Sequence, residues 1–151
     1  MNGIKAIQRL WGGIVQGSKV VVDSAPLIYI LDNHPLFSLQ FEGLFDAQER
    51  GDISIALSTI TLTEVLAGPY KAGAITLAKR YEQALLNFDM VPVTPTIAVL
   101  AAQLRAQYRL KAPDAIQLAT ALEIGASALV THDRDFSSVT GIRVILGDRP
   151  V

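Results

Sequence analysis

Residues 19–31 read K-V-V-V-D-S-A-P-L-I-Y-I-L, and this stretch decides the fold class that the sequence predicts. From Lys19 to Asp23 the run is short and nearly all apolar, which favours a strand covered on both faces, as in a parallel sheet. The run ends on an acid, and Ser24 and Pro26 then supply the cap and the first turn of a helix. A strand followed at once by a helix indicates an α/β fold.

Short apolar strands and amphipathic helices continue to alternate toward the C-terminus. Further strands are expected at residues 53–58, 90–93, 128–131 and 142–146. Helices are expected at about 24–33, 35–50, 59–67, 74–87, 94–108 and 112–123, and Gly68-Pro69 is expected to end the helix at 59–67. We therefore predict a three-layer α/β/α sandwich around a mainly parallel sheet of about five strands. Residues 1–18 are predicted to form an N-terminal extension with a short helical piece, and residues 19–151 a single domain.

Composition limits the classes of protein to which the chain can belong. Half of the 151 residues are apolar and 18% are charged, which is typical of a domain with a buried core. The absence of cysteine excludes disulfides and thiolate metal sites, and it favours a cytoplasmic location. With only two histidines, a metal site must rely mainly on oxygen ligands. No apolar run reaches the roughly 18–20 residues of a membrane helix, and residues 1–19 lack the pattern of a signal peptide.

The charge balance is uneven along the chain. The formal net charge of −1 argues against a protein that coats nucleic acid by bulk charge. Between residues 71 and 111, however, six basic residues face two acidic ones, a surplus of four positive charges. Such a surplus suits a polyanionic substrate, although on charge alone ordinary solvated helix surfaces are the commoner explanation.

Four acidic residues are expected at one edge of the sheet. Asp23 ends the first strand, Asp133 follows the fourth, and Glu64 lies on the helix after the second strand. Asp114 opens the helix that leads into the fourth strand, so that helix must begin at the same edge. In open parallel sheets, sites form at the carboxyl ends of the strands. Singly, each acid has an ordinary explanation as a helix cap, a turn residue or a surface residue. Their shared placement favours a functional site.

A cluster of carboxylates repels itself, and burial strengthens the repulsion. The usual remedy is a hard divalent cation with oxygen ligands, for which Mg²⁺ or Mn²⁺ is better suited than zinc. Such an ion activates water and stabilises the charge that develops on a phosphodiester. Because the sequence has no thiol and no clear pairing of serine with histidine, metal-assisted hydrolysis is the chemistry that these residues support best.

Four segments in register resemble the pattern of the PIN-domain family, and especially of VapC-type toxins. They are V-V-V-D-S-A-P-L-I-Y-I-L (20–31), T-L-T-E-V-L-A-G (61–68), A-P-D-A-I-Q-L-A-T-A (112–121) and A-L-V-T-H-D-R-D-F (128–136). The resemblance runs from Lys19 to the C-terminus and implies a Mg²⁺- or Mn²⁺-dependent endoribonuclease. It also implies that the family's catalytic, metal-binding acids correspond to Asp23, Glu64, Asp114 and Asp133.

The resemblance extends to residues beside these acids, with two departures. Ser24 matches the small polar residue after the first acid, and Thr131 matches a hydroxyl residue that supports the metal shell. Asp135 competes with Asp133 for the place of the fourth acid. His132 stands where members of the family often carry asparagine. It is expected to be a solvent-facing turn residue in preference to a metal ligand.

The resemblance implies three partners: an RNA substrate, a small antitoxin protein and a second copy of the chain. The candidate contacts to RNA are Arg105, Arg109 and Lys111. An apolar stripe could form a partner groove, although packing in the core is the commoner use of such a stripe; it consists of Phe37, Phe41, Leu44 and Phe45. The main alternative function is a non-catalytic PIN-fold module that binds RNA or a protein partner. A receiver-like phosphotransferase fits less well, because no lysine ends a later strand.

Overall fold

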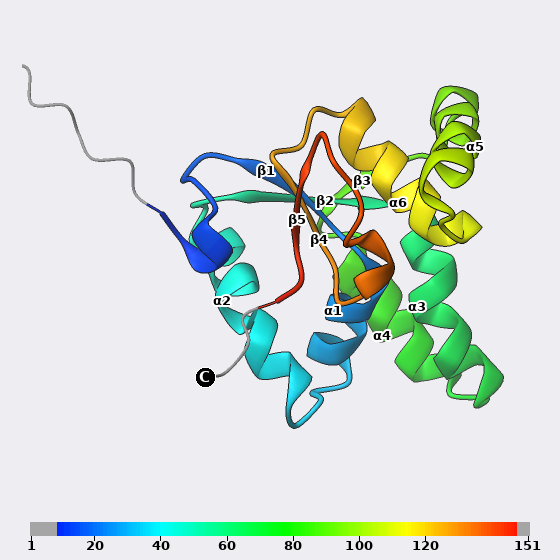
Figure 1. Ribbon diagram of the computed structural model, residues 1–151. Helices are drawn as coiled ribbons and strands as arrows, with labels where there is room; N and C mark the ends of the chain where they lie inside the picture. The colour runs from blue at the N-terminus through cyan, green and yellow to red at the C-terminus, as the bar shows by residue number, and fades with distance from the viewer. Residues whose placement is uncertain (1–8, 148–151) are drawn as a thin grey trace, which may run out of the picture.

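Five parallel strands form the centre of the molecule (Figure 1). The computed structural model describes residues 9–147, and within them the strands lie in the order β3-β2-β1-β4-β5. The strands are β1 (Lys19–Val22), β2 (Ser54–Ser58), β3 (Asp89–Val91), β4 (Ala128–Val130) and β5 (Arg143–Ile145). All four neighbouring pairs are parallel. The predicted parallel sheet is thereby confirmed, with β1 at its centre.

The valines of β1 show why the central strand is apolar throughout. Val20 and Val22 point to one face of the sheet and Val21 to the other, and all three are fully buried. In a sheet that is covered on both sides, no position of such a strand reaches water, so the sequence lacks the alternation of polar and apolar residues.

Within residues 9–147, six helices supply the two outer layers of the sandwich (Figure 1). One face is covered by α1 (Ser24–Leu31), α2 (Phe37–Glu49), α3 (Ile60–Lys71) and α4 (Ile75–Leu85), and the other by α5 (Pro95–Tyr108) and α6 (Ala112–Glu123). Two short 3₁₀ helices, η1 (Trp11–Gly13) and η2 (Arg134–Phe136), lie outside these layers. No helix within residues 9–147 has both the length and the apolar character needed to span a membrane.

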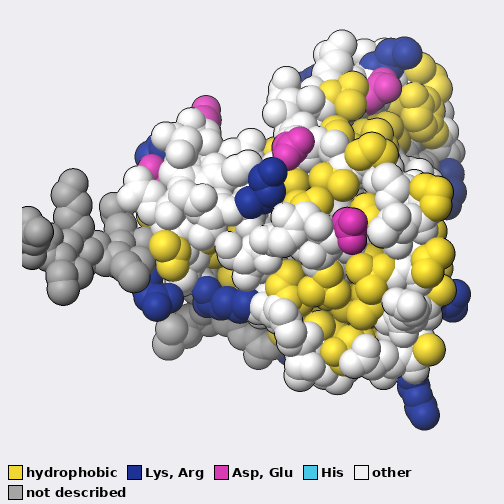
Figure 2. Space-filling model, turned by 90° about the horizontal axis from the view of Figure 1, so that it is seen from above, with side chains coloured by type: hydrophobic (Ala, Val, Ile, Leu, Met, Phe, Trp, Pro, Cys, Tyr) yellow, Lys and Arg dark blue, Asp and Glu magenta, His cyan; other side chains and the backbone are white. Residues whose placement is uncertain are grey.

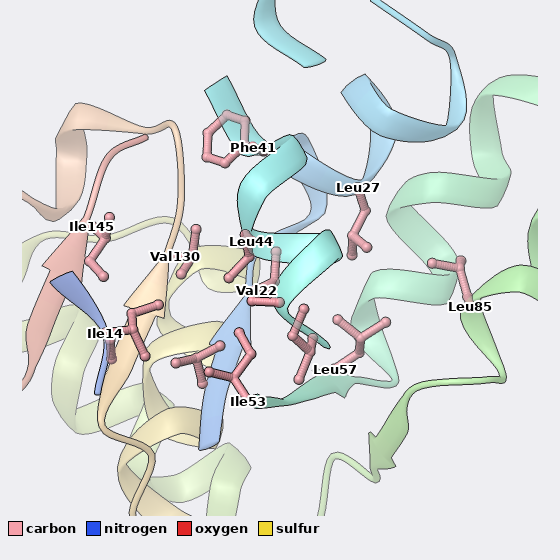
Figure 3. Packing of buried hydrophobic residues seen from close by; sticks show 14 of the residues in the cluster. Ile14, Val22, Leu27, Phe41, Leu44, Ile53, Leu57, Leu85, Val130 and Ile145 are labelled. Atoms are coloured by element: carbon pink, nitrogen blue, oxygen red, sulfur yellow. The ribbon is translucent and has the colours of Figure 1, made fainter. Parts of the chain in front are cut away.

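The apolar stripe of α2 belongs mainly to the core. Phe41 and Leu44 are fully buried, and they pack with Leu27, Val22 and Val130 between the helices and the sheet (Figure 3). Phe37 and Phe45, which complete the stripe, are partly exposed. The interpretation of the stripe as a partner groove is therefore wrong for its two central members.

Helix α3 continues past the point at which the sequence predicted its end. It runs through Gly68 and Pro69 to Lys71. Proline lacks the N–H that would bond one turn back, but its position in the last turn limits the loss to the end of the helix. The residue before a proline normally avoids helical geometry because its Cβ meets the proline ring, and Gly68 has no Cβ. The Gly-Pro pair is thus compatible with a helix here.

The described part of the N-terminal extension, residues 9–18, packs against the main domain. The indole Nε1 of Trp11 donates a hydrogen bond to the carbonyl of Gln40 in α2, at 3.0 Å. The guanidinium of Arg143 in β5 donates to the carbonyl of Gly12. Ile14 is buried in the same core as α2. The extension thereby connects α2 to the edge strand β5. The apolar residues Ile4 and Ile7 of the predicted helical piece lie outside the described residues.

We predict that Gly43→Ala displaces Trp11. A Cβ at Gly43 would lie 2.8 Å from Cδ1 of the Trp11 ring, which also packs 5.9 Å from the ring of Phe41. Overpacking costs about 1–3 kcal/mol, whereas the gain in helix propensity is about 1 kcal/mol. We therefore expect the free energy of unfolding to fall by about 1 kcal/mol. Because Trp11 is the only tryptophan, its fluorescence should report the displacement directly. Glu42→Ala, at an exposed position of the same helix, is the control; higher stability with unchanged emission would contradict the prediction.

Candidate active site

The predicted acids lie where the order of the strands reverses. From the central β1 the sheet continues to β2 and β3 on one side and to β4 and β5 on the other. Such a reversal leaves a crevice at the carboxyl ends of the two strands, and ligands bind there in open α/β sheets. Asp23 directly follows β1, and Asp133 follows β4 and caps η2. In Figure 1, β1 runs down to the start of α1, where Asp23 lies between the two elements.

Asp23 is held by two hydrogen bonds. Its Oδ1 accepts from the backbone N–H of Ser24 at 2.7 Å, and its Oδ2 accepts from Oγ1 of Thr131 at 2.8 Å. The side chain is only 6% exposed. Burial raises the pKa of Asp23, and the charges of Glu64 and Asp133 raise it further, against the two hydrogen bonds that lower it. Asp23 therefore caps α1, and its two hydrogen bonds fix the orientation of a carboxylate whose ionised form is disfavoured by burial.

Ser24 and Thr131 connect the acids to one another. The Oγ of Ser24 donates to Oε1 of Glu64 at 2.7 Å, which joins the first turn of α1 to α3. Thr131, fully buried, accepts at Oγ1 from the backbone N–H of Asp133 at 3.1 Å while it donates to Asp23. Ser24 thus contacts Glu64 through its hydroxyl and Asp23 through its backbone N–H, and the hydroxyl of Thr131 contacts both the carboxylate of Asp23 and the backbone of Asp133.

The pKa of Asp114 is raised well above its ordinary value. It lies in the first turn of α6 and is partly buried. Burial raises its pKa to about 7, together with the charges of Asp23, Asp133 and Glu64 and a hydrogen bond to Asp133. The four predicted acids therefore interact electrostatically as one group, although they come from four separate parts of the chain.

Asp135 belongs to the same cluster. Carboxylate oxygens of Asp114, Asp133 and Asp135 all lie within 4.8 Å of one another, close enough to share one metal ion. The backbone N–H of Asp135 also donates to Oδ1 of Asp133 at 2.9 Å. The structure thus places both candidates for the fourth acid beside Asp114, with Asp133 half-buried and Asp135 exposed.

The donor set fits a hard divalent cation. The ion pairs within residues 9–147 are Lys19–Asp89 and Arg50–Asp52, and neither includes an acid of the cluster. The cluster is accordingly a concentration of carboxylate oxygens without a neutralising lysine or arginine, and Mg²⁺ and Mn²⁺ prefer such ligands. On the face seen from above, acidic side chains are scattered singly (Figure 2).

His132 is not a solvent-facing turn residue. It is partly buried, and its Nδ1 lies 2.9 Å from the hydroxyl of Tyr29, so the two share a hydrogen bond. Its ring packs edge-on against Tyr29, Phe37 and Phe41, with centroids 4.8–5.8 Å away. The turn after β4 points this side chain toward α1 and α2, which sequence spacing did not indicate. Burial, and then the charge of Asp23, raise the pKa of Tyr29, because its hydroxyl lies near the acids.

Basic residues surround the start of α6. Arg109 ends α5 in the left-handed conformation (φ 56°), and Lys111 immediately precedes α6, three residues before Asp114. Arg105 donates from Nε to the carbonyl of Leu110, so it also shapes this loop. Arg134, which the sequence analysis did not select, is exposed between two acids of the cluster. Within the described residues none of these side chains forms an ion pair.

Sequence reasoning also missed a buried polar contact behind the acids. Nε2 of Gln117 in α6 donates to Oγ1 of Thr61 in α3 at 2.9 Å, and both side chains are fully buried. The signal was present in A-I-Q-L-A, where one amide interrupts an apolar run three residues after Asp114. A polar residue on a buried helix face needs a partner, although the sequence does not name it.

Fold and site together define an α/β protein with a cluster of carboxylates at the switch point of its sheet. The family profile described as PIN domain matches residues 20–142, and the chain therefore belongs to the PIN-domain family. The match includes all four predicted acids. A comparison with curated protein sequences found no match.

Solved structures share this fold. The chain is similar to a protein in a toxin–antitoxin complex from Klebsiella pneumoniae, with 30% identity, a TM-score of 0.65, and coverage of 82% of this chain and 94% of that one. It is also similar to a chain of VapBC2 from Rickettsia felis, bound to a promoter DNA fragment. The identity is 16%, the TM-score is 0.68, and the match covers 86% of this chain and 99% of that one. A third similar structure is VapC20 from Mycobacterium tuberculosis, described as a sarcin-ricin loop cleaving toxin. The identity is 15%, the TM-score is 0.67, and the match covers 82% of this chain and 98% of that one.

We predict that Asp114 destabilises the metal-free protein near neutral pH. The folded state holds the proton of Asp114 up to about pH 7, whereas the unfolded chain releases it near the ordinary pKa of 3.8. The folded state therefore binds more protons between these values, and stability falls as the pH rises through them. Asp114→Asn removes this loss and should raise the free energy of unfolding at pH 7.5 by about 1–2 kcal/mol, since water screens a partly exposed group.

The measurement is urea unfolding in EDTA at a series of pH values. The difference between the variant and the unchanged protein should be small at pH 4 and should grow to pH 7. Asp46→Asn, at an exposed position of α2, is the control and should show no such trend. Parallel stability profiles for Asp114→Asn and the unchanged protein would show that Asp114 bears no such strain.

Proposed function

We propose that this protein is a metal-dependent endoribonuclease that hydrolyses phosphodiester bonds in RNA. The observation that carries the proposal is the electrostatic group formed by its four acids, which no basic side chain of the described residues neutralises. In this proposal Asp23, Glu64, Asp114 and Asp133 hold Mg²⁺ or Mn²⁺ and are the catalytic residues. Membership of the PIN-domain family supports it, as does the likeness to a protein described as a toxin that cleaves the sarcin-ricin loop.

The residues of the site have separate tasks in the proposed reaction. A bound divalent ion supplies Lewis acidity, which activates water and offsets negative charge on the phosphate. Thr131 and the N–H of Ser24 orient the carboxylate of Asp23, and the hydroxyl of Ser24 orients Glu64. Asp114 must release its proton, which it holds up to about pH 7, before it can act as an anionic ligand.

We further propose that the protein is the toxin of a toxin–antitoxin pair. The K. pneumoniae protein, 30% identical, comes from a toxin–antitoxin complex, and the R. felis and Salmonella typhimurium neighbours come from VapBC structures. On this basis the partners are a small antitoxin protein and a second copy of the chain, and the location is the cytoplasm. The alternative, a PIN-fold module that binds without cutting, keeps the same fold but has no use for the acid cluster.

We predict that cleavage of RNA requires both the acids and the cation. The purified protein should cut a defined set of RNAs in Mn²⁺ and leave them intact in EDTA. Asp23→Asn, Glu64→Gln and Asp114→Asn should each lower the rate on the order of 100-fold or more, since the electrostatic stabilisation at stake is several kcal/mol. Asp46→Asn is the control. Metal-independent cleavage would exclude the proposed chemistry, and binding without cleavage would favour the alternative module.

The same assay decides which residue is the fourth acid. If Asp133 is the ligand, Asp133→Asn should match the loss seen for Asp114→Asn, and Asp135→Asn should retain most of the activity. The reverse pattern would assign the role to Asp135. The half-buried position of Asp133 and its hydrogen bond from the N–H of Asp135 favour the first outcome.

We predict that Arg109 and Lys111 contact RNA phosphates. Replacement of both by glutamine should reduce the slope of log affinity against log salt concentration by about 1.4, because each lost phosphate contact on a single strand removes about 0.7. The measurement is fluorescence anisotropy with a labelled RNA in EDTA, from low to high salt. Arg105 is left unchanged because it also bonds to the loop. Lys79→Gln with Arg80→Gln, on α4, is the control pair; identical slopes for both pairs would remove Arg109 and Lys111 from the RNA path.

A further inference from the structure

One buried hydrogen bond connects the two helices that carry Glu64 and Asp114. Within the described residues, Gln117 to Thr61 is the side-chain hydrogen bond that joins α6 to α3, and its length is 2.9 Å. Neither side chain is exposed to solvent. The contact lies between the helices, and neither residue belongs to the acid cluster itself.

The register of this bond relates it to the acids. Gln117 follows Asp114 by three residues on α6, and Thr61 precedes Glu64 by three residues on α3. Residues three apart on a helix lie on the same face, about one turn apart. The bond therefore joins the two helices one turn from each acid, where a small change in helix spacing would change the separation of the two carboxylates.

The amide of Gln117 is a costly way to fill this space. Its Oε1 is buried and has no hydrogen-bond partner within residues 9–147. A buried, unpaired polar atom costs about 1–3 kcal/mol, whereas apolar groups in place of both partners of such a bond are often neutral or stabilising. Leucine would fill similar space without this cost. Stability alone therefore does not explain why this position holds a glutamine. A hydrogen bond, unlike an apolar contact, fixes the distance and direction between α6 and α3.

Repulsion between the acids would tend to separate α3 from α6, and the bond between Gln117 and Thr61 opposes that movement. A carboxylate oxygen of Asp114 lies within 4.8 Å of those of Asp133 and Asp135, and the charges of Asp23, Asp133 and, to the smallest extent, Glu64 disfavour its ionised form. Glu64 is held on its α1 side by the hydroxyl of Ser24, but that contact does not reach α6. Without a connection between α3 and α6, the helices could move apart and relieve the repulsion. A relaxed pair of acids would bind a cation less tightly, because more of the repulsion would have to be restored on binding.

We propose that Gln117 is a positioning residue: its bond to Thr61 holds Glu64 and Asp114 at the spacing that a divalent cation requires. This inference rests on the proposed function, because it assumes that both acids bind the cation. The bond sets the affinity for the cation more than it sets the stability of the fold. Gln117 takes no part in the chemistry itself.

The test compares two variants whose effects on stability differ in sign. Gln117→Leu removes the unpaired oxygen and leaves the hydroxyl of Thr61, so the melting temperature in EDTA should stay level or rise. Thr61→Val leaves the whole amide of Gln117 buried and unpaired, so the melting temperature should fall. Both variants should nevertheless raise the dissociation constant for Mn²⁺ about tenfold, as expected when a group that supports metal ligands is lost. The measurement is isothermal titration calorimetry with Mn²⁺ alone.

Two further comparisons separate positioning from general damage. Gln48→Leu makes the same chemical change at the other buried, unpaired amide oxygen of the described residues, on α2 and outside the acid cluster. It should leave the affinity for Mn²⁺ unchanged. Thr61→Ser keeps the hydroxyl and should retain most of the affinity. The double variant Gln117→Leu with Thr61→Val should bind Mn²⁺ no more weakly than the weaker single variant, because both remove the same bond.

The outcomes distinguish this inference from the proposed function. If the unchanged protein binds Mn²⁺ and cuts RNA while Gln117→Leu and Thr61→Val bind Mn²⁺ equally well, the positioning role is wrong and the nuclease stands. If the unchanged protein binds no Mn²⁺ at millimolar concentration, both proposals fail. A loss of affinity that follows melting temperature across all variants, Gln48→Leu included, would reduce Gln117 to a structural role.

Discussion

Carboxylates that lie within reach of one another repel, and the fold has to hold them together against that repulsion. The two-sided core of the sheet provides the rigidity, because β1 and β4 are buried on both faces and deliver Asp23 and Asp133 to one edge. Burial and the neighbouring carboxylates raise the pKa of both Asp23 and Asp114, although two hydrogen bonds oppose the shift at Asp23. In the proposed function a bound cation relieves both effects, and the polar contacts around the acids keep them in place for it.

Hydrogen bonds from residues that are not acids hold together the strands and helices that carry the acids. Thr131 connects the ends of β1 and β4, and Ser24 connects α1 to α3. Gln117 and Thr61 connect α3 to α6 from below the site. Together these contacts reach every element that carries one of the four acids. We expect the repulsion between the acids to lower the stability of the metal-free protein, and sites that bind or react commonly keep such a cost because function depends on it.

The location of the acids could be predicted from the sequence because topology alone determines it. A residue that ends a parallel strand lies at the carboxyl edge whatever its neighbours are, and Asp23 and Asp133 needed no further information. The Gln117–Thr61 contact depends on how two helices cross, and the placement of His132 depends on which way one turn points. Neither is encoded in spacing along the chain. The extension of α3 through Pro69 was missed because a Gly-Pro pair usually ends a helix, and only the absent Cβ of Gly68 makes this case different.

Shared acids cannot by themselves explain which RNA a nuclease of this family would cut. A cation held by carboxylates acts on the phosphodiester group, and that group is the same at every nucleotide. In the proposed reaction, selection must therefore come from side chains around the cluster that can contact bases or the shape of the RNA. In this chain those neighbours are the basic residues before α6 on one side and the rings of Tyr29, Phe37 and His132 on the other. In the proposed reaction the acids thus supply the chemistry, while selectivity depends on these neighbouring groups.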